Sequence, residues 1–196
     1  MKKLIIILSL FCLSMTNSTH HGVIYFIQDY QEAFYPNHEF SEILLVSINE
    51  QKMYHIKDDI LLKTFPISSS KFGESNRKNS FQTPLGLHRI KRKIGHQLAP
   101  GTIIINGEPT DQIANILKDP TDVEEDLITS RLLWLDGLEK DVNHHSFERR
   151  IYIHGTNEEG LIGSKSSHGC IRMTNSDIIS LYPLINEGVY VLIIDL

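Results

Sequence analysis

Residues 43–67 read ILLVSINEQKMYHIKDDILLKTFPI. Three short apolar runs alternate with two polar segments, Asn49-Glu50-Gln51 and Lys57-Asp58-Asp59. Short runs rich in β-branched, aliphatic and aromatic residues between polar turn residues are typical of strands, so this stretch predicts a three-stranded meander. Strands spaced this closely predict a mainly β domain with a β-sandwich-like or barrel-like core.

Further strands are expected downstream of the meander. Thr83-Pro84-Leu85-Gly86 has the composition of a turn, because proline fixes φ and glycine permits a tight reversal. The apolar runs beyond this turn predict strands at 87–90, 102–106, 131–135, 151–153 and 189–194.

Two segments have helical features. Ile113, Ile116 and Leu117 recur at helical spacing, which predicts a helical insertion within 109–138, before the strand at 131–135. Thr174-Asn175-Ser176-Asp177 predicts a capped N-terminus for an amphipathic helix that extends to Ile185. The expected fold is therefore mainly β, with a helical insertion and one helix after Cys170.

The N-terminus has the features of an export signal. Lys2 and Lys3 precede an apolar run, 4–13, and small and polar residues follow it through Ser18. Because a membrane-spanning helix needs about 20 apolar residues, the sequence predicts a signal peptide at 1–18 and not a span. Retention of this segment as an anchor is the alternative. We expect an N-terminal lead-in at 19–40 after it.

The charge pattern argues against one class of partner. The formal net charge is −5, and the 19 lysines and arginines are scattered along the chain. Nucleic-acid-binding proteins carry clustered basic residues, so no nucleic acid is expected as a partner.

Cys170 is the main candidate for chemistry. The other cysteine, Cys12, lies within the predicted signal, so the exported chain would have an unpaired thiol. An unpaired cysteine in an oxidising compartment suggests a nucleophile. Thiols react as thiolates, so a group must accept the proton. We predict that His154, at the end of the strand 151–153, is this base, and that its imidazolium form lowers the pKa of Cys170.

The residues around Cys170 fit acyl transfer. Gly169 has no side chain, so the backbone amides of Gly169 and Cys170 are predicted to bind a developing oxyanion. Arg172 offers a guanidinium group for a substrate carboxylate. A buried structural thiol and a zinc site of His154, His168 and Cys170 are alternatives. No metal is expected, because neither a second cysteine nor an acidic ligand lies at motif spacing from these residues.

The motif His154-Gly155-Thr156, followed by Ser167-His168-Gly169-Cys170-Ile171-Arg172, closely resembles the signature of the L,D-transpeptidase catalytic-domain family. The resemblance extends to 83–86, to 131–137 and to the opening meander. It covers roughly 41–196, which is therefore expected to be the catalytic domain.

The resemblance implies a bacterial enzyme of the periplasm or cell envelope that acts on peptidoglycan stem peptides without a cofactor. Cys170 would attack the carbonyl of the third, diamino-acid residue, release the terminal D-alanine and form a thioester. An amine of another stem peptide or of an envelope protein would then take the acyl group. By the same resemblance, His154 is the base, Gly169 and Cys170 form the oxyanion site, and Ser167, His168 and Arg172 shape the substrate pocket.

Two other functions remain open from the sequence. Water in place of the amine would make the protein an L,D-carboxypeptidase. A non-catalytic module that binds the cell wall is a third hypothesis, although such a module would not need an activated thiol.

Members of the family are inhibited by carbapenems, which acylate the cysteine.

Overall fold

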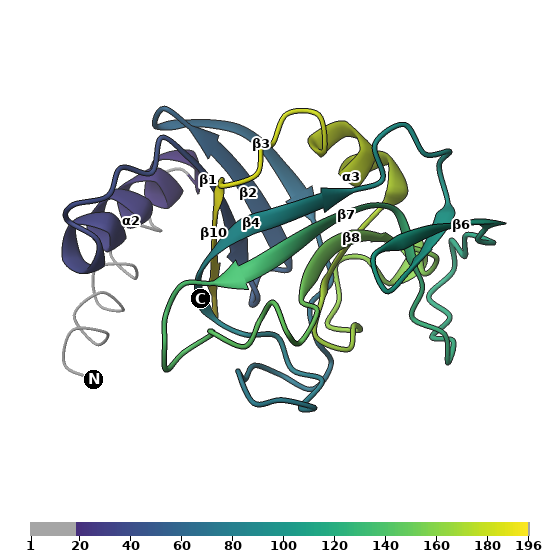
Figure 1. Cartoon of the computed structure of the whole chain (residues 1–196). Coiled ribbons are helices and arrows are strands. Elements are labelled where there is room, and N and C mark those ends of the chain that lie inside the picture. The colour runs from purple at the N-terminus through teal and green to yellow at the C-terminus, as the bar shows by residue number, and fades with distance from the viewer. Residues whose placement is uncertain (1–18, 196) are drawn as a thin grey trace.

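The computed structural model describes residues 19–195, so the predicted signal at 1–18 lies outside the described part of the chain. Within this part the fold is mainly β, as the sequence predicts (Figure 1). Ten strands form one mixed sheet among the described residues. Their bounds are β1 (Glu42–Ser47), β2 (Lys52–Lys57), β3 (Ile60–Pro66), β4 (Gly86–Ile94), β5 (Thr102–Ile105), β6 (Glu108–Ile113), β7 (Ile128–Gly137), β8 (Tyr152–Thr156), β9 (Ile171–Met173) and β10 (Tyr190–Ile194).

The strand order brings distant segments of the chain together. The main path runs β3-β2-β1-β10-β4-β7-β5-β6, and β8 joins β7 to β9. β1 pairs in parallel with β10, and β8 pairs in parallel with β9. The predicted meander of β1, β2 and β3 is confirmed, and the strands predicted at 87–90, 102–106, 131–135, 151–153 and 189–194 correspond to β4, β5, β7, β8 and β10. β6 and β9 have no counterpart in the sequence prediction.

β1 is buried on both faces of the sheet. Leu44 and Val46 pack into a core that also contains residues of the C-terminal helix, whereas Ile43 and Leu45 pack into a second core on the other face. Side chains alternate between the two faces of a strand, so an uninterrupted apolar run fits a strand that is covered on both sides.

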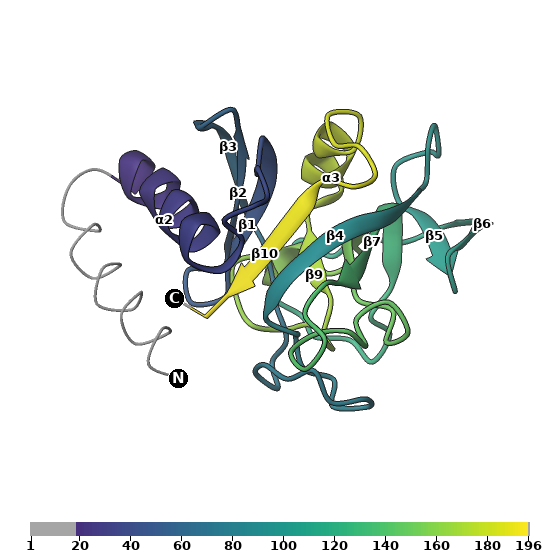
Figure 2. The ribbon, with the colours of Figure 1, turned by 60° about the vertical axis from the view of Figure 1, so that its left-hand side comes forward.

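The second core is covered by helix α2 (Thr19–Phe34), which lies against the β1, β2 and β10 end of the sheet (Figures 1 and 2). Val23, Phe26 and Ile27 are buried in this core, and Tyr30 and Phe34 pack against it. These positions follow the i, i+3, i+4, i+7 spacing of an amphipathic helix. The region for which the sequence predicts only an N-terminal lead-in, 19–40, is therefore largely a docked helix.

The predicted helical insertion is wrong. Residues 108–113 form β6, and the chain then runs without a helix to Ile128. The backbone of Leu117 bonds outside its own segment: its N–H donates to the Asn157 carbonyl at 2.7 Å, and its carbonyl accepts from Gly160 at 3.0 Å. Ile113 is 57% exposed, so the helical spacing of the apolar residues does not mark a buried face.

The helix after Cys170 is confirmed as α3 (Asn175–Leu181). The Thr174 hydroxyl accepts from the Asp177 N–H at 3.1 Å and donates to the Asp177 carboxylate at 2.9 Å, which closes the predicted cap. The helix is shorter than predicted, because Pro183 cannot donate a backbone hydrogen bond to a further turn.

Candidate active site

The site is built on the parallel pair β8 and β9, where His154 lies opposite Arg172. Ile153 and Ile171 also pair, and both point into the core beneath α3. His154 and Arg172 therefore point to the other face of the sheet. Cys170 precedes β9 by one residue and packs on that same face against a cluster that contains Tyr152. The fold thus places the candidate base in the middle of β8, and not at the end of its strand as predicted, and the candidate nucleophile directly before the adjacent strand β9.

A short loop before β9 positions Cys170. Gly169 has φ of +118°, a conformation that favours glycine, and an added Cβ would lie 3.3 Å from the Gln82 carbonyl oxygen. The Ser167 hydroxyl donates to the Cys170 carbonyl at 2.6 Å, and the Thr83 hydroxyl donates to the Gly169 carbonyl at 3.1 Å. Hydrogen bonds from both sides thus fix the loop.

One of the two predicted oxyanion donors, the Gly169 N–H, is already hydrogen-bonded to Ser167. The Gly169 N–H donates to the Ser167 hydroxyl at 3.2 Å, so an oxyanion would compete for this donor. Ser167 is fully buried and holds the loop. The oxyanion role of Gly169 and Cys170 and the substrate contact of Ser167 stay predictions.

The thiol of Cys170 is protonated at neutral pH. Cys170 is half-buried, and its Sγ donates to the Arg150 carbonyl at 3.4 Å. Burial, together with the nearby carboxylate of Asp126, raises the pKa of Cys170 to about 12.

His154 is neutral at the same pH. Its side chain is buried, and this burial lowers its pKa, although the Asp126 carboxylate opposes the shift. Nδ1 lies 2.7 Å from the Gly155 carbonyl oxygen. A carbonyl only accepts, so Nδ1 carries the proton and Nε2 keeps a free lone pair. This tautomer is the one a general base requires.

These two environments correct the expectation of a resting imidazolium beside a thiolate. Burial penalises both charged forms, and the carboxylate of Asp126 disfavours the thiolate further. The resting pair is therefore a neutral thiol and a neutral imidazole, and charge has to develop during the reaction.

Arg172 is fully buried and already engaged by carboxylates. Its Nη2 lies 2.8 Å from Asp126 Oδ2, and its Nη1 lies 2.8 Å from Glu158 Oε2. Burial by itself raises the pKa of Asp126, but Arg172, together with His154 and His168, holds this pKa below the usual value. Arg172 Nε has no hydrogen-bond partner among the described residues, and the predicted contact of Arg172 with a substrate carboxylate stays a prediction. The geometry fits a positioning role.

His168 lies at the edge of the site. Its Nδ1 is 3.2 Å from Asp126 Oδ2, and its imidazole packs beside the rings of Phe72 and Phe81. It comes from the same loop as Cys170 but faces Asp126, so the predicted role in substrate binding stays a prediction.

The sequence model of the YkuD family, described as the L,D-transpeptidase catalytic domain, matches residues 41–193. The chain belongs to this family. Within that match lie the His154 strand, the Cys170 loop and the sheet described above, apart from the last residue of β10.

Individual relatives agree with the assignment. YqjB of Bacillus subtilis (strain 168), whose name assigns it to the L,D-transpeptidases, is 51% identical over 47 residues, which are 24% of this chain and 27% of that protein. An L,D-transpeptidase from Mycobacterium smegmatis superposes with a TM-score of 0.51 at 19% identity, over 79% of this chain and 58% of that one. An L,D-transpeptidase from Xylanimonas cellulosilytica superposes with a TM-score of 0.50 at 16% identity, over 85% of this chain and 68% of that one. This chain therefore spans about a quarter of YqjB and somewhat over half of the mycobacterial protein, and these structural likenesses concern the fold.

The L,D-transpeptidase domain also uses residues near the site that sequence reasoning missed. Gly155 follows the candidate base, and a Cβ there would lie 2.7 Å from both the Asn175 side-chain oxygen and the Thr129 carbonyl. Asn175 in turn accepts from the Thr129 hydroxyl at 2.7 Å. Asp126 belongs to the same group, because its carboxylate lies 2.8 Å from Arg172 Nη2. These residues lie far apart in the sequence, and no local pattern announces their contacts.

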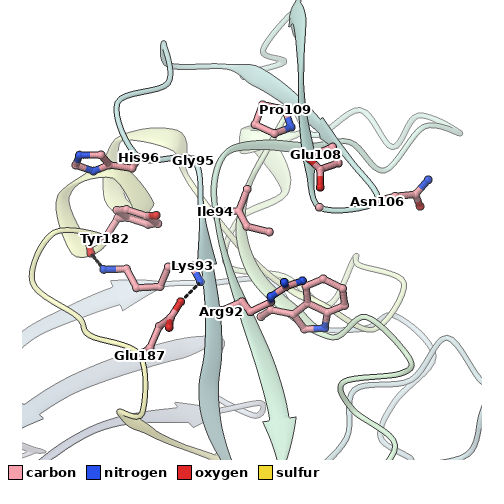
Figure 3. Close-up of a pocket in the computed structure, with 12 residues that line it drawn as sticks. Arg92, Lys93, Ile94, Gly95, His96, Asn106, Glu108, Pro109, Tyr182 and Glu187 are labelled. Carbon is pink, nitrogen blue, oxygen red and sulfur yellow. Dashed lines mark hydrogen bonds between the residues drawn. The ribbon is translucent and has the colours of Figure 1, made fainter.

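A pocket of about 430 Å³ lies away from Cys170 and His154, between the end of β4 and the turn from β5 to β6 (Figure 3). Lys93 Nζ donates to the Tyr182 carbonyl at 2.7 Å, and the Lys93 N–H donates to Glu187 at 3.0 Å. Trp134 lines this pocket and also packs in the cluster that includes Cys170.

Residues 19–195 contain no group of three or more histidine, cysteine, aspartate and glutamate side chains that could hold a metal ion. In the same range, no helix has the length and apolar character needed to cross a membrane.

Proposed function

We propose that this chain is a cysteine-dependent L,D-transpeptidase that acts on peptidoglycan stem peptides through a thioester on Cys170. One observation carries the proposal: within a domain of this family, a neutral imidazole with its Nδ1 protonated lies in β8, and a thiol directly precedes the adjacent parallel strand β9. Nucleophilic catalysis by cysteine requires this combination of thiol and base.

The first half-reaction forms the thioester. As Cys170 Sγ attacks the carbonyl carbon of the third stem residue, His154 Nε2 accepts the thiol proton. The tetrahedral intermediate then collapses, the C–N bond breaks, and His154 returns the proton to the amine of the departing D-alanine. Because the free thiol has a high pKa, proton transfer and attack are expected to occur together.

The second half-reaction resolves the thioester. An amine of another stem peptide attacks the acyl carbon, gives its proton to His154, and the C–S bond breaks. The proton then returns to Sγ. Arg172, held by Asp126 and Glu158, keeps β9 and the Cys170 loop in position through both steps.

An intact-mass experiment with a carbapenem tests the nucleophile. The wild-type protein should gain one covalent adduct on Cys170, and Cys170→Ala should gain none. An adduct on another residue, or none on the wild type, contradicts the assignment.

Product analysis distinguishes the acceptors. Incubation with purified tetrapeptide stems should give crosslinked dimers if an amine resolves the thioester, whereas tripeptides alone would indicate an L,D-carboxypeptidase. An envelope protein is a further acceptor that the proposed chemistry permits. Export to the periplasm or cell envelope belongs to the same proposal, since stem peptides lie there.

A further inference from the structure

Two exposed phenylalanines lie beside the nucleophile loop. Phe72 and Phe81 belong to the segment between β3 and β4 and are 49% and 57% exposed. Their ring centroids are 6.2 Å apart and lie 5.7 and 6.0 Å from the imidazole of His168, which is two residues before Cys170. We call these three rings the aromatic surface.

Hydrogen bonds hold this surface in place. The Ser70 hydroxyl donates to the Phe81 carbonyl at 2.5 Å, and the Gln82 amide donates to the Phe72 carbonyl at 2.7 Å. The guanidinium of Arg149 donates to the Gln82 carbonyl. The segment is therefore fixed both to itself and to the chain just before β8.

Phe81 adopts an unusual backbone conformation. Its φ is +57°, a region that bulky side chains rarely occupy. Its ring is more than half exposed, so core packing does not compensate for the strain. Backbone strain of this kind clusters at active sites and ligand clamps. The Phe81 backbone also lies against Gly169, since an added Cβ there would be 3.6 Å from the Phe81 carbonyl carbon.

Lys71 shows which chemistry the surface accepts. Its ammonium nitrogen lies 5.9 Å from the Phe72 ring centroid and 2.8 Å from Asp122 Oδ2. An alkyl chain that ends in an ammonium group thus already lies between an aromatic ring and a carboxylate. Aromatic faces attract such cations, and alkyl stems pack on them.

We propose that the aromatic surface binds the aliphatic side chain of the diamino acid whose carbonyl Cys170 attacks, with the terminal ammonium group directed to Asp122 in place of Lys71. This inference rests on the proposed function, because it assumes a stem-peptide donor. Phe72 and Phe81 are then specificity-determining residues, and they act on binding of the donor and not on the chemical step.

The test uses three tetrapeptide donors that differ only in the third residue: lysine, norleucine or alanine. Release of terminal D-alanine gives KM and kcat for the wild type, Phe72→Ala, Phe81→Gly and Asp122→Asn. Phe81→Gly removes the ring and suits the positive φ, so it should fold even if Phe72→Ala does not. Leu62→Ala, an exposed apolar side chain of β3, is the matched control.

For the wild type, KM should rise from lysine to norleucine to alanine. Phe81→Gly should raise KM for the lysine and norleucine donors about tenfold, which is the effect of losing contact with about two methylenes. It should leave kcat for all three donors and KM for the alanine donor unchanged. Asp122→Asn should remove only the preference for lysine over norleucine.

If Phe81→Gly changes KM equally for all three donors, or does not change it, the proposed binding role of the aromatic surface is wrong, while the proposed function stands. A wild type that releases D-alanine from none of the donors would overturn both. A comparable rise of KM in Leu62→Ala would show that the effect is not specific to the aromatic surface, and it would overturn the proposed binding role of that surface too.

Discussion

Replacement of Arg172 by glutamine tests whether this residue positions the site or binds substrate. The side chain is 1% exposed, and its partner Glu158 is 0% exposed. Removing one member of a buried ion pair leaves the other charge uncompensated and costs about 3–5 kcal/mol. We expect Arg172→Gln to lower the free energy of unfolding by about this amount. Arg172→Gln with Glu158→Gln should recover part of the loss, because Glu158 is then no longer an unpaired buried charge, whereas Asp126 still lacks its partner.

Urea denaturation followed by the fluorescence of Trp134, the one tryptophan of the chain, measures these changes. Arg89→Gln is the matched control: Arg89 pairs with Asp136 at 2.9 Å, but its side chain is 49% exposed. An exposed pair of this kind should contribute at most about 1 kcal/mol.

The pH dependence adds a second measurement. The fold lowers the pKa of Asp126, so the stabilisation from its pair with Arg172 is present above the unfolded-state pKa and is lost as pH falls through the folded-state pKa. The difference between wild type and Arg172→Gln should therefore shrink below about pH 4. If Arg172→Gln is as stable as Arg89→Gln and raises only the KM for the donor, Arg172 binds substrate and the buried-pair reasoning is wrong.

Three further predictions concern the catalytic residues. His154→Ala should slow carbapenem acylation by about 10²- to 10⁴-fold, the usual contribution of a general base, and His168→Ala by much less; the reverse ranking in a stopped-flow assay would reassign the base. Because burial lowers the pKa of His154, the imidazole stays neutral through pH 7, and the acylation rate should fall only on the acid side of about pH 6.5; a decline that begins above pH 7 would contradict this. Gly169→Ala should destabilise the fold by about 1–3 kcal/mol and also slow acylation, since alanine is strained at φ of +118°; an unchanged urea midpoint would refute the strain argument.

Much of the fold follows from local sequence patterns. The apolar runs of β1, β2 and β3 alternate with polar turns, and Thr174 and Asp177 cap α3 through contacts three residues apart. The spacing of Val23, Phe26 and Ile27 also marks α2, so this missed helix was available from the same kind of pattern. Such signals are short-range, because strand alternation and helix capping depend on neighbouring residues.

The sequence by itself determined the strand meander, the capped helix and the pairing of a His154 motif with a Cys170 motif. Only the tertiary structure decided that 109–127 holds no helix, that Asp126 and Glu158 enclose Arg172, and that the resting thiol and imidazole are both neutral. The reason is physical: desolvation and ion pairing depend on which distant segments surround a side chain, and no local pattern encodes that environment.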